Sequence, residues 1–215
     1  MKIDMNKYRT IAKEAQAEIV EKRSRFIANV MPVSSEEEAL KYLNIIKQRH
    51  WDARHNVYAY VIKENNLMRY SDDGEPGGTA GVPILEILKK EELTDLIIVV
   101  TRYFGGILLG TGGLVHAYSK SAKAGVEAAG ITEMILCRKI ILKCDYNLMG
   151  KLQYEIASFD DAFCSETNYG ETVEISVYVA VESEDRFVAR ITDATNAATD
   201  ITRGEIEYFE KSANF

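Results

Sequence analysis

The sequence predicts an α+β protein of two domains, and three features of the chain support this class. Predicted strands and helices alternate along residues 17–129, which is typical of a layered α/β domain. From residue 137 on, the predicted order is βαββαβ, as in the ferredoxin-like sandwich. Residues 1–135 hold 18 Lys and Arg and 18 Asp and Glu, whereas residues 136–215 hold 8 and 15, which accounts for the net charge of −7. We expect domains over residues 1–134 and 135–215.

The first domain is predicted to begin with an extended segment over residues 17–33, which ends at Pro32. Ser34 or Ser35 then caps a helix, because three glutamates follow in its first turn, where negative charge favours the helix dipole. The run Leu96–Val100 is apolar throughout, as expected of a strand covered on both faces. The other elements of this domain are expected at residues 56–62 (strand), 79–90 (helix) and 113–129 (helix).

The second domain is predicted from the order of its strands and helices. A strand over residues 137–146 leads into a helix over 147–158 that begins with Asn147. Residues 162–182 form a hairpin that turns near Gly170 and Glu171, and Ser183 caps a helix that reaches residue 196. Residues 204–210 are the last strand.

Composition limits the class of protein and of partner. The apolar fraction of 47% and the charged fraction of 27% are those of ordinary soluble domains. Three cysteines without a CxxC pair indicate neither a disulfide framework nor a zinc site. There is no signal sequence and no run long enough to span a membrane, so we expect a cytoplasmic protein without a membrane partner. The acidic second domain is a poor candidate for wrapping nucleic acid.

Residues 71–118 carry the strongest functional signal. They hold nine of the fourteen glycines and two of the three prolines, and the strand inside them ends in Arg102, Tyr103 and Phe104. Glycine permits unusual backbone conformations and close approach to another surface. Two glycine-rich loops beside a fixed charge and two aromatic rings are hard to explain by packing alone.

The second of these loops, GGILLGTGG, has two glycines at the spacing of a phosphate loop. A Walker motif then requires Lys and Ser or Thr, but Thr111 and Gly112 stand there, and Val115 replaces the third glycine of GxGxxG. A glycine-rich loop before a helix still presents free N–H groups that attract anions. A tight structural turn is the alternative. The candidate anion-binding residues are Gly105, Gly106, Gly110, Thr111, Gly112 and Gly113.

The first loop, SDDGEPGG, holds three carboxylates, from Asp72, Asp73 and Glu75. They do not follow the EF-hand pattern, and the paired carboxylates of glycosidases usually come from different elements. Asp-Gly and Glu-Pro are common in turns, which favours a structural loop. The functional alternative is that these acids hold a cation, either Mg²⁺ or the guanidinium of Arg102. We assign no metal site and no cofactor.

The Arg-Tyr-Phe segment could pair with phosphate and stack on bases. Alternation places Arg102 and Phe104 on one face of the strand and Tyr103 on the other, so at least one aromatic ring is expected in the core. Arg54, His55 and His116 complete the binding candidates, although His55 also fits a capping role. There is no HxxxH spacing, GxSxG elbow or Cys–His signature, so no catalytic residue is assigned.

These segments also resemble the YigZ/IMPACT family. The resemblance is carried by KRSRFIA (22–28), ARHNVYAY (53–60), SDDGEPGGTAGVPIL (71–85) and IIVVTRYFGGILLGTGGLVHAYS (97–119). It implies a first domain with the fold shared by a small-subunit ribosomal protein domain and elongation factor G domain IV. It implies a second domain like elongation factor G domain V. Eukaryotic relatives regulate translation during amino-acid starvation and carry an extra RWD domain, which we do not expect here. Relatives usually have Arg or Lys at the position of His116.

We therefore expect a translation-associated regulatory protein that acts by binding rather than as an enzyme. It would bind RNA, the ribosome or a translation factor through Arg102 and the two glycine loops, with Arg54 and Arg69 nearby. Two alternatives stay open. One is an enzyme of GHMP-kinase-like fold that binds a nucleotide or another phosphate ligand. The other is a protein-interaction adaptor that docks through its acidic second domain.

Overall fold

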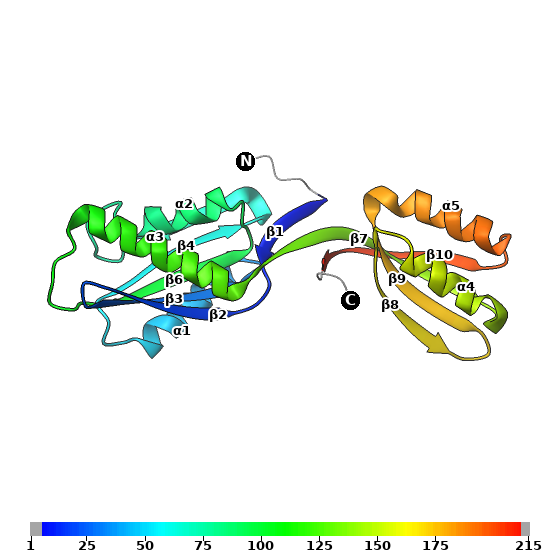
Figure 1. Ribbon diagram of the computed structural model, residues 1–215, viewed down its shortest axis with the longest axis horizontal. Helices are drawn as coiled ribbons and strands as arrows, with labels where there is room; N and C mark the ends of the chain where they lie inside the picture. Colours follow the sequence, from blue (N-terminus) through cyan, green and yellow to red (C-terminus); the bar gives the residue numbers. More distant parts are fainter. Residues whose placement is uncertain (1–5, 212–215) are drawn as a thin grey trace. The chain divides into compact units, whose positions relative to one another are not determined.

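The computed structural model describes residues 6–211, without the side chains of residues 164 and 165, and it divides into two compact units (Figure 1). The first unit is Arg9–Thr132. Of the described chain, residues 6–8 and 133–211 make up the second unit. The N-terminal residues join the second unit because the Tyr8 ring packs against Tyr208, with centroids 5.0 Å apart, and Leu136 N–H donates to the Asn6 carbonyl at 2.7 Å.

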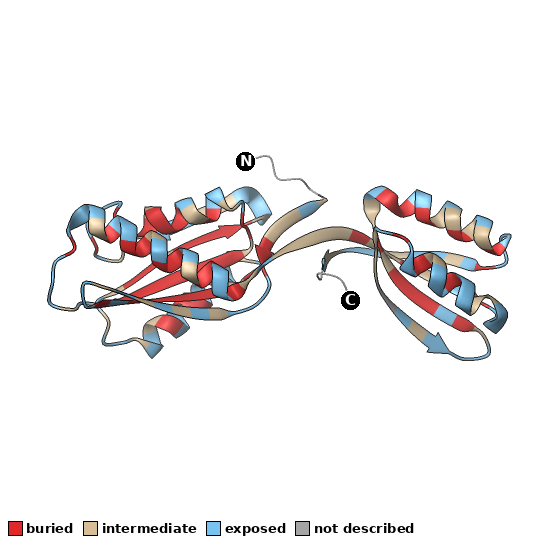
Figure 2. Ribbon diagram, viewed as in Figure 1, coloured by how far each residue is buried: buried red, intermediate tan, exposed pale blue. Residues whose placement is uncertain are grey.

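The first unit is a five-stranded antiparallel sheet between two layers of helices. One helix, α1 (Glu36–Arg49), covers one face, and α2 (Gly81–Lys90) and α3 (Gly110–Ala129) cover the other, as Figure 1 and the buried residues in Figure 2 show. In sheet order the strands are β2 (Ala15–Glu21), β3 (Ser24–Pro32), β6 (Leu96–Tyr103), β4 (His55–Ile62) and β5 (Leu67–Ser71).

The central strand β6 determines where the functional side chains lie. All its residues except Tyr103 are buried, which confirms the predicted strand covered on both faces. Ile98 and Val100 belong to the core formed with α2 and α3, and Ile97 and Val99 belong to the core formed with α1. Because side chains alternate, Arg102 lies on the α2–α3 face of the sheet.

Three features of the first unit differ from the prediction. The expected extended segment 17–33 is two strands, β2 and β3, joined at Lys22 and Arg23, whose φ angles are +44° and +65°. No glycine marks this left-handed turn. Strand β5 was not expected. Helix α3 begins at Gly110 rather than at residue 113. Three of its first four residues are glycines, which disfavour helix, so the sequence pattern did not indicate this first turn. The predicted cap of α1 is confirmed, since Glu38 N–H donates to Ser35 Oγ at 3.2 Å.

The second unit has the predicted βαββαβ order. Its sheet order is β8-β9-β7-β10, with β1 (Lys7–Ile11) also next to β7, and α4 and α5 cover one face (Figure 1). Its elements are β7 (Ile131–Cys144), α4 (Tyr146–Ala157), β8 (Ala162–Tyr169), β9 (Val173–Ala180), α5 (Glu184–Thr195) and β10 (Asp200–Glu210).

Both predicted helix caps of this unit need correction. Helix α4 is preceded by Asp145 at the N-cap rather than beginning at Asn147. Ser183 occupies the N-cap of α5, but its hydroxyl donates to Asp161 Oδ2 at 2.5 Å and makes no capping hydrogen bond. In neither unit is any described helix long and apolar enough to cross a membrane.

Candidate functional site

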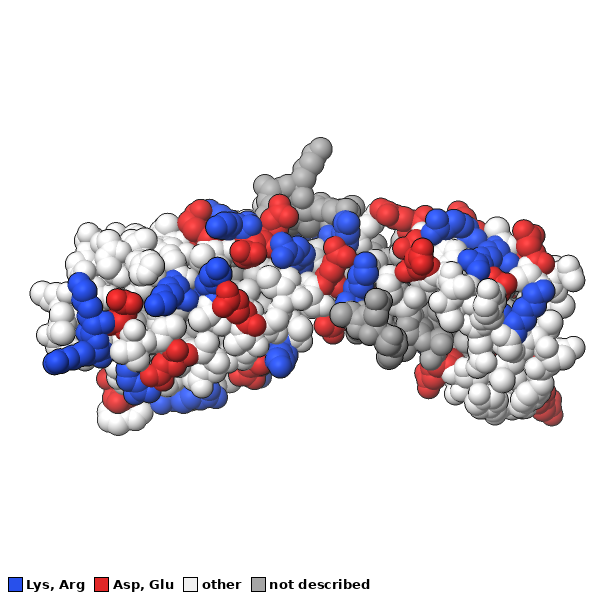
Figure 3. Space-filling model, viewed as in Figure 1, with Lys and Arg blue, Asp and Glu red and all other residues white. Residues whose placement is uncertain are grey.

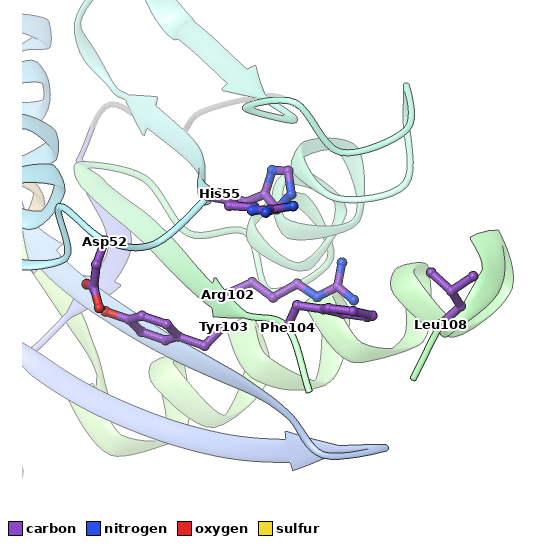
Figure 4. Close-up of a pocket in the computed structure, with 7 residues that line it drawn as sticks. Asp52, His55, Arg102, Tyr103, Phe104 and Leu108 are labelled. Carbon is purple, nitrogen blue, oxygen red and sulfur yellow. The ribbon is translucent and has the colours of Figure 1, made fainter. Parts of the chain in front are cut away.

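A cleft of about 600 Å³ opens in the first unit where β4 begins and β6 ends (Figure 4). These two strand ends meet because His55 is the register partner of Arg102. Four of the predicted binding residues come together here: Arg54, His55, Arg102 and Tyr103. The residues that line the cleft are Asp52, Arg54, His55, Arg102, Tyr103, Phe104 and Leu108.

Arg102 lies at the base of the cleft and is only 7% exposed. Its Nη1 donates to Glu75 Oε1 at 2.7 Å, and the Tyr118 hydroxyl donates to the same oxygen at 2.8 Å. Its guanidinium carbon is 5.4 Å from the centroid of the Phe26 ring and 5.6 Å from that of Phe104. Burial, followed by the charge of Glu75, raises the pKa of Tyr118, which keeps this phenol protonated. The acidic loop (residues 71–81) therefore does hold a cation, and this cation is the guanidinium of Arg102.

The ion pair with Glu75 uses only part of the hydrogen-bonding capacity of Arg102. Among the described residues its one acceptor is Glu75, through Nη1. Nε is buried and has no acceptor in this part of the chain. A buried donor without an acceptor costs about 1–3 kcal/mol, and a guanidinium fork fits two neighbouring acceptor atoms. The fold thus fixes the orientation of Arg102 and leaves its Nε donor without an acceptor among the described residues.

His55 lies on the same face of the sheet as Arg102 and supplies an acceptor. Its Nδ1 is 2.9 Å from the Asp73 carbonyl oxygen. A carbonyl only accepts, so Nδ1 carries the hydrogen, and Nε2 of the neutral ring is then an acceptor. His55 holds the acidic loop in place, as the capping interpretation expects, and it also lines the cleft, as the binding interpretation expects.

The two aromatic residues of the segment lie outside the core, so the prediction that at least one is buried there is wrong. Strand β6 ends at Tyr103, and Phe104 in the loop after it is 54% exposed. The Tyr103 hydroxyl donates to Asp52 Oδ1 at 2.9 Å and is 2.9 Å from His50 Nδ1. Burial, with the hydrogen bond to Asp52, raises the pKa of Tyr103. The phenol of Tyr103 therefore keeps its proton, and the side chain lines the cleft.

The acidic loop, residues 71–81, is held together by its own carboxylates. Asp72 accepts hydrogen bonds from the backbone N–H groups of Gly78, Ala80 and Gly81, at 2.8, 3.0 and 2.8 Å, where α2 begins. Asp73 accepts from Asn56 N–H at 2.6 Å and Lys47 Nζ at 3.2 Å. These contacts match the structural interpretation of the loop. No group of three or more His, Cys, Asp or Glu among the described residues is arranged to hold a metal ion.

The glycine loop, residues 104–113, contributes to the cleft through Phe104 and Leu108, while its glycines lie elsewhere. A Cβ on Gly105 would be 2.0 Å from the Arg23 carbonyl carbon, so this glycine permits close packing on the β2–β3 turn. Gly106 and Gly110 have φ angles of +83° and +73°.

The start of α3 does not line the cleft. Leu109 is the N-cap residue of this helix and makes no side-chain capping bond. The helix amides of residues 110–113 are not part of the cleft that contains Arg102. The predicted binding residues that do not line the cleft are Gly105, Gly106, Gly110, Thr111, Gly112, Gly113 and the exposed His116.

Two cations beside the cleft were not predicted from the sequence, and one cation that was predicted to lie near the binding surface is distant from the cleft. Lys22 and Arg23 are exposed at the β2–β3 turn, next to Gly105. Arg69 pairs with Tyr60, five residues along β4 from His55, which is about 17 Å at the usual rise of a strand. Figure 3 shows Lys and Arg side chains at the end of the first unit that carries the start of α3. The KRSR sequence at residues 22–25 was the available signal.

We call Lys22, Arg23 and Arg54 the basic rim. All three are exposed, and the described part of the chain gives none of them an ion pair. Arg25 differs, because its Nε is 2.7 Å from Glu18 Oε1. The site therefore combines unpaired surface cations with a buried arginine and an exposed aromatic ring.

Residues 22–126 match the Impact N-terminal domain, and residues 142–198 match a Domain of unknown function (DUF1949). The IMPACT family member YvyE of Bacillus subtilis is 44% identical over 211 residues, which cover 98% of this chain and 97% of YvyE. The chain belongs to the IMPACT family. The IMPACT family member YigZ of Escherichia coli is 31% identical, over 80% of this chain and 85% of its own.

Two further comparisons cover different shares of the chain. The Protein IMPACT homolog of Dictyostelium discoideum is 42% identical over 103 residues, which cover 46% of this chain and 29% of that protein. A solved structure titled "Crystal structure of an hypothetical protein" is 28% identical with a TM-score of 0.60, over 94% of this chain and 99% of its own. The basic rim and all residues of the cleft lie within the segment that matches the Impact N-terminal domain.

Proposed function

We propose that this IMPACT family member is a translation-associated binding protein that contacts RNA through the basic rim and the cleft. The observation that carries the proposal is a set of three exposed cations, to which residues 6–211 give no ion pair, beside a cleft that contains Arg102 and Phe104. Cations that no acid neutralises are those that release counterions from phosphate. The resemblance to translation-factor domains supports RNA of the translation machinery as the partner.

The nucleotide-enzyme alternative receives less support from the geometry. It requires carboxylates that place Mg²⁺, but Asp72 accepts from three backbone N–H groups and Asp73 from a backbone N–H and a lysine. Glu75 is paired with Arg102 and Tyr118. What remains for a phosphate is the start of α3, whose residues do not line the cleft that contains Arg102. We therefore favour binding over catalysis.

The test is the affinity for labelled single-stranded RNA, measured across a salt series. We expect binding that weakens as salt rises, and a double variant Arg23→Ala, Arg54→Ala with a shallower dependence. Each lost phosphate contact on a single strand lowers the slope of log K against log salt by about 0.7. Arg69→Ala is the matched control, since Arg69 is exposed on the same unit but distant, and it should bind like the wild type. Absence of binding at low salt would overturn the proposal.

A further inference from the structure

We infer that the cleft accepts one unstacked RNA base, which stacks on Phe104 and turns its acceptor edge to Arg102. This inference rests on the proposed function and makes it specific: the basic rim holds the phosphates and the cleft holds a base. Single-stranded RNA is commonly recognised in this way, because a splayed base has both a π face and unpaired polar edges.

The apolar side of the cleft favours a base. Phe104 is 54% exposed and Leu108 is 83% exposed. In Figure 4, Leu108 lies across the opening from Phe104 and His55. Large exposed apolar side chains around a concave site indicate a ligand with an apolar face. The volume of about 600 Å³ lies within the range of sites for small organic ligands.

The polar side of the cleft favours the uncharged, acceptor-rich edge of a base over a phosphate group. Inside the cleft, the charge of Arg102 is balanced by Glu75, and the carboxylate of Asp52 is part of the lining. The cleft thus has little net charge with which to attract an anion. It offers instead Arg102, which is more than nine-tenths buried, is held by Glu75 through Nη1 alone, and has no acceptor for Nε among the described residues.

Guanine fits this arrangement better than the other bases. Its O6 and N7 atoms are neighbouring acceptors, and an arginine fork is their usual partner. The Nε2 atom of His55 is an acceptor on the same face as Arg102, and guanine also carries N–H donors. We therefore expect the cleft to prefer an unpaired guanine.

The first experiment compares RNA affinity at a single low salt concentration and over the salt series. Phe104→Ala should weaken binding about tenfold, as the loss of one stacked base does, while the salt slope stays that of the wild type. Tyr154→Ala is the control, because Tyr154 is 69% exposed on α4 and lies outside the site. A strand with guanine at one position should bind more tightly than the same strand with uracil there, and Phe104→Ala should reduce this difference.

The second experiment uses fluorescence and does not depend on the affinity. The chain has one tryptophan, Trp51, so Phe104→Trp combined with Trp51→Phe places the only indole in the cleft. This variant should retain RNA binding, and the bound base should quench the indole. The Trp51→Phe, Tyr154→Trp variant should show no quenching.

Three results would overturn the inference, and they separate it from the proposed function. If Phe104→Ala binds like the wild type while the Arg23→Ala, Arg54→Ala variant is weaker, the rim binds RNA and the cleft takes no base. If the cleft indole is quenched by an acidic peptide but not by RNA, the cleft serves a protein partner. If the wild type binds no RNA, the proposed function fails as well.

Discussion

The acidic loop, residues 71–81, and the glycine loop, residues 104–113, look alike in sequence and differ in the structure. In the acidic loop each carboxylate accepts hydrogen bonds from groups within the protein. In the glycine loop Phe104 and Leu108 are exposed, and the first turn of α3 has no side-chain cap. Glycine content alone therefore does not identify a binding loop. What distinguishes the two loops is whether their polar groups already have hydrogen-bond partners within the protein.

The comparison assigns different roles to the two loops. A change in the acidic loop should lower the free energy of unfolding. A change at the exposed side chains beside the glycine loop should lower the affinity for RNA and leave the fold intact. Variants of both loops test whether stability and RNA affinity divide in this way.

The largest expected effect is that of Glu75→Gln in the acidic loop. The substitution leaves the Arg102 guanidinium buried without its counter-charge, so we expect a loss of about 3–5 kcal/mol in the free energy of unfolding by denaturant. The control is Glu86→Gln, which removes an exposed pair with Lys89 and should cost less than about 1 kcal/mol. Equal costs for the two variants would show that the buried pair does not hold the loop.

The next largest effect is a change of stability that should have opposite signs at two glycines of the glycine loop. Gly105→Ala places a Cβ 2.0 Å from the Arg23 carbonyl carbon, so the backbone must shift, at a cost of about 1–3 kcal/mol. Gly112→Ala meets no atom within 4 Å and lies in α3, where alanine should add up to about 1 kcal/mol. Thermal unfolding of both variants measures whether stability falls in Gly105→Ala and rises in Gly112→Ala. A loss of stability in both would mean that Gly112 also has a packing role.

A smaller effect is expected at the start of α2. Asp72→Ala removes the acceptor of three backbone N–H groups and should cost about 1–2 kcal/mol of unfolding free energy. Asp72→Asn keeps one side-chain oxygen as an acceptor and should cost less. Chemical denaturation of the pair measures the difference, and an Asn variant as unstable as the Ala variant would point to charge rather than to capping.

The smallest effect is a dependence of stability on pH through His50. Burial, with the charge of Arg49, lowers the pKa of His50 in the folded state. The unfolded chain therefore takes up a proton first as pH falls below about 6.5, and stability declines until the lower folded pKa is reached. His50→Gln should flatten this decline in unfolding curves measured at successive pH values. His116→Gln, at an exposed position on α3, should leave it as in the wild type.

Much of the fold was predictable because local patterns agree with the tertiary structure. The Ser35 cap, the apolar run of β6 and the βαββαβ order each follow from residues close in sequence. The turn at Lys22 and Arg23 was not predictable, because two long basic residues adopt the left-handed conformation there. Strand β5 is short and only partly buried, so its pattern is weak.

The site was predictable only in part, because it depends on strand register. The sequence indicated Arg102 as a site residue, and one of its interpretations was that the acidic loop binds the Arg102 guanidinium. It could not place Leu108 and Asp52 in one cleft, since that requires His55 to lie opposite Arg102. The sequence also could not show that the first turn of α3 does not line the cleft, because glycine content does not determine where the backbone amides lie.

The most direct test of the account is the affinity for single-stranded RNA at low salt, measured side by side for three proteins. These are the wild type, Asp72→Ala from the acidic loop and the double variant Arg23→Ala, Arg54→Ala from the basic rim. The account predicts that Asp72→Ala, while still folded, binds like the wild type and that the double variant binds about tenfold or more weakly. Equal affinities for all three proteins would contradict it.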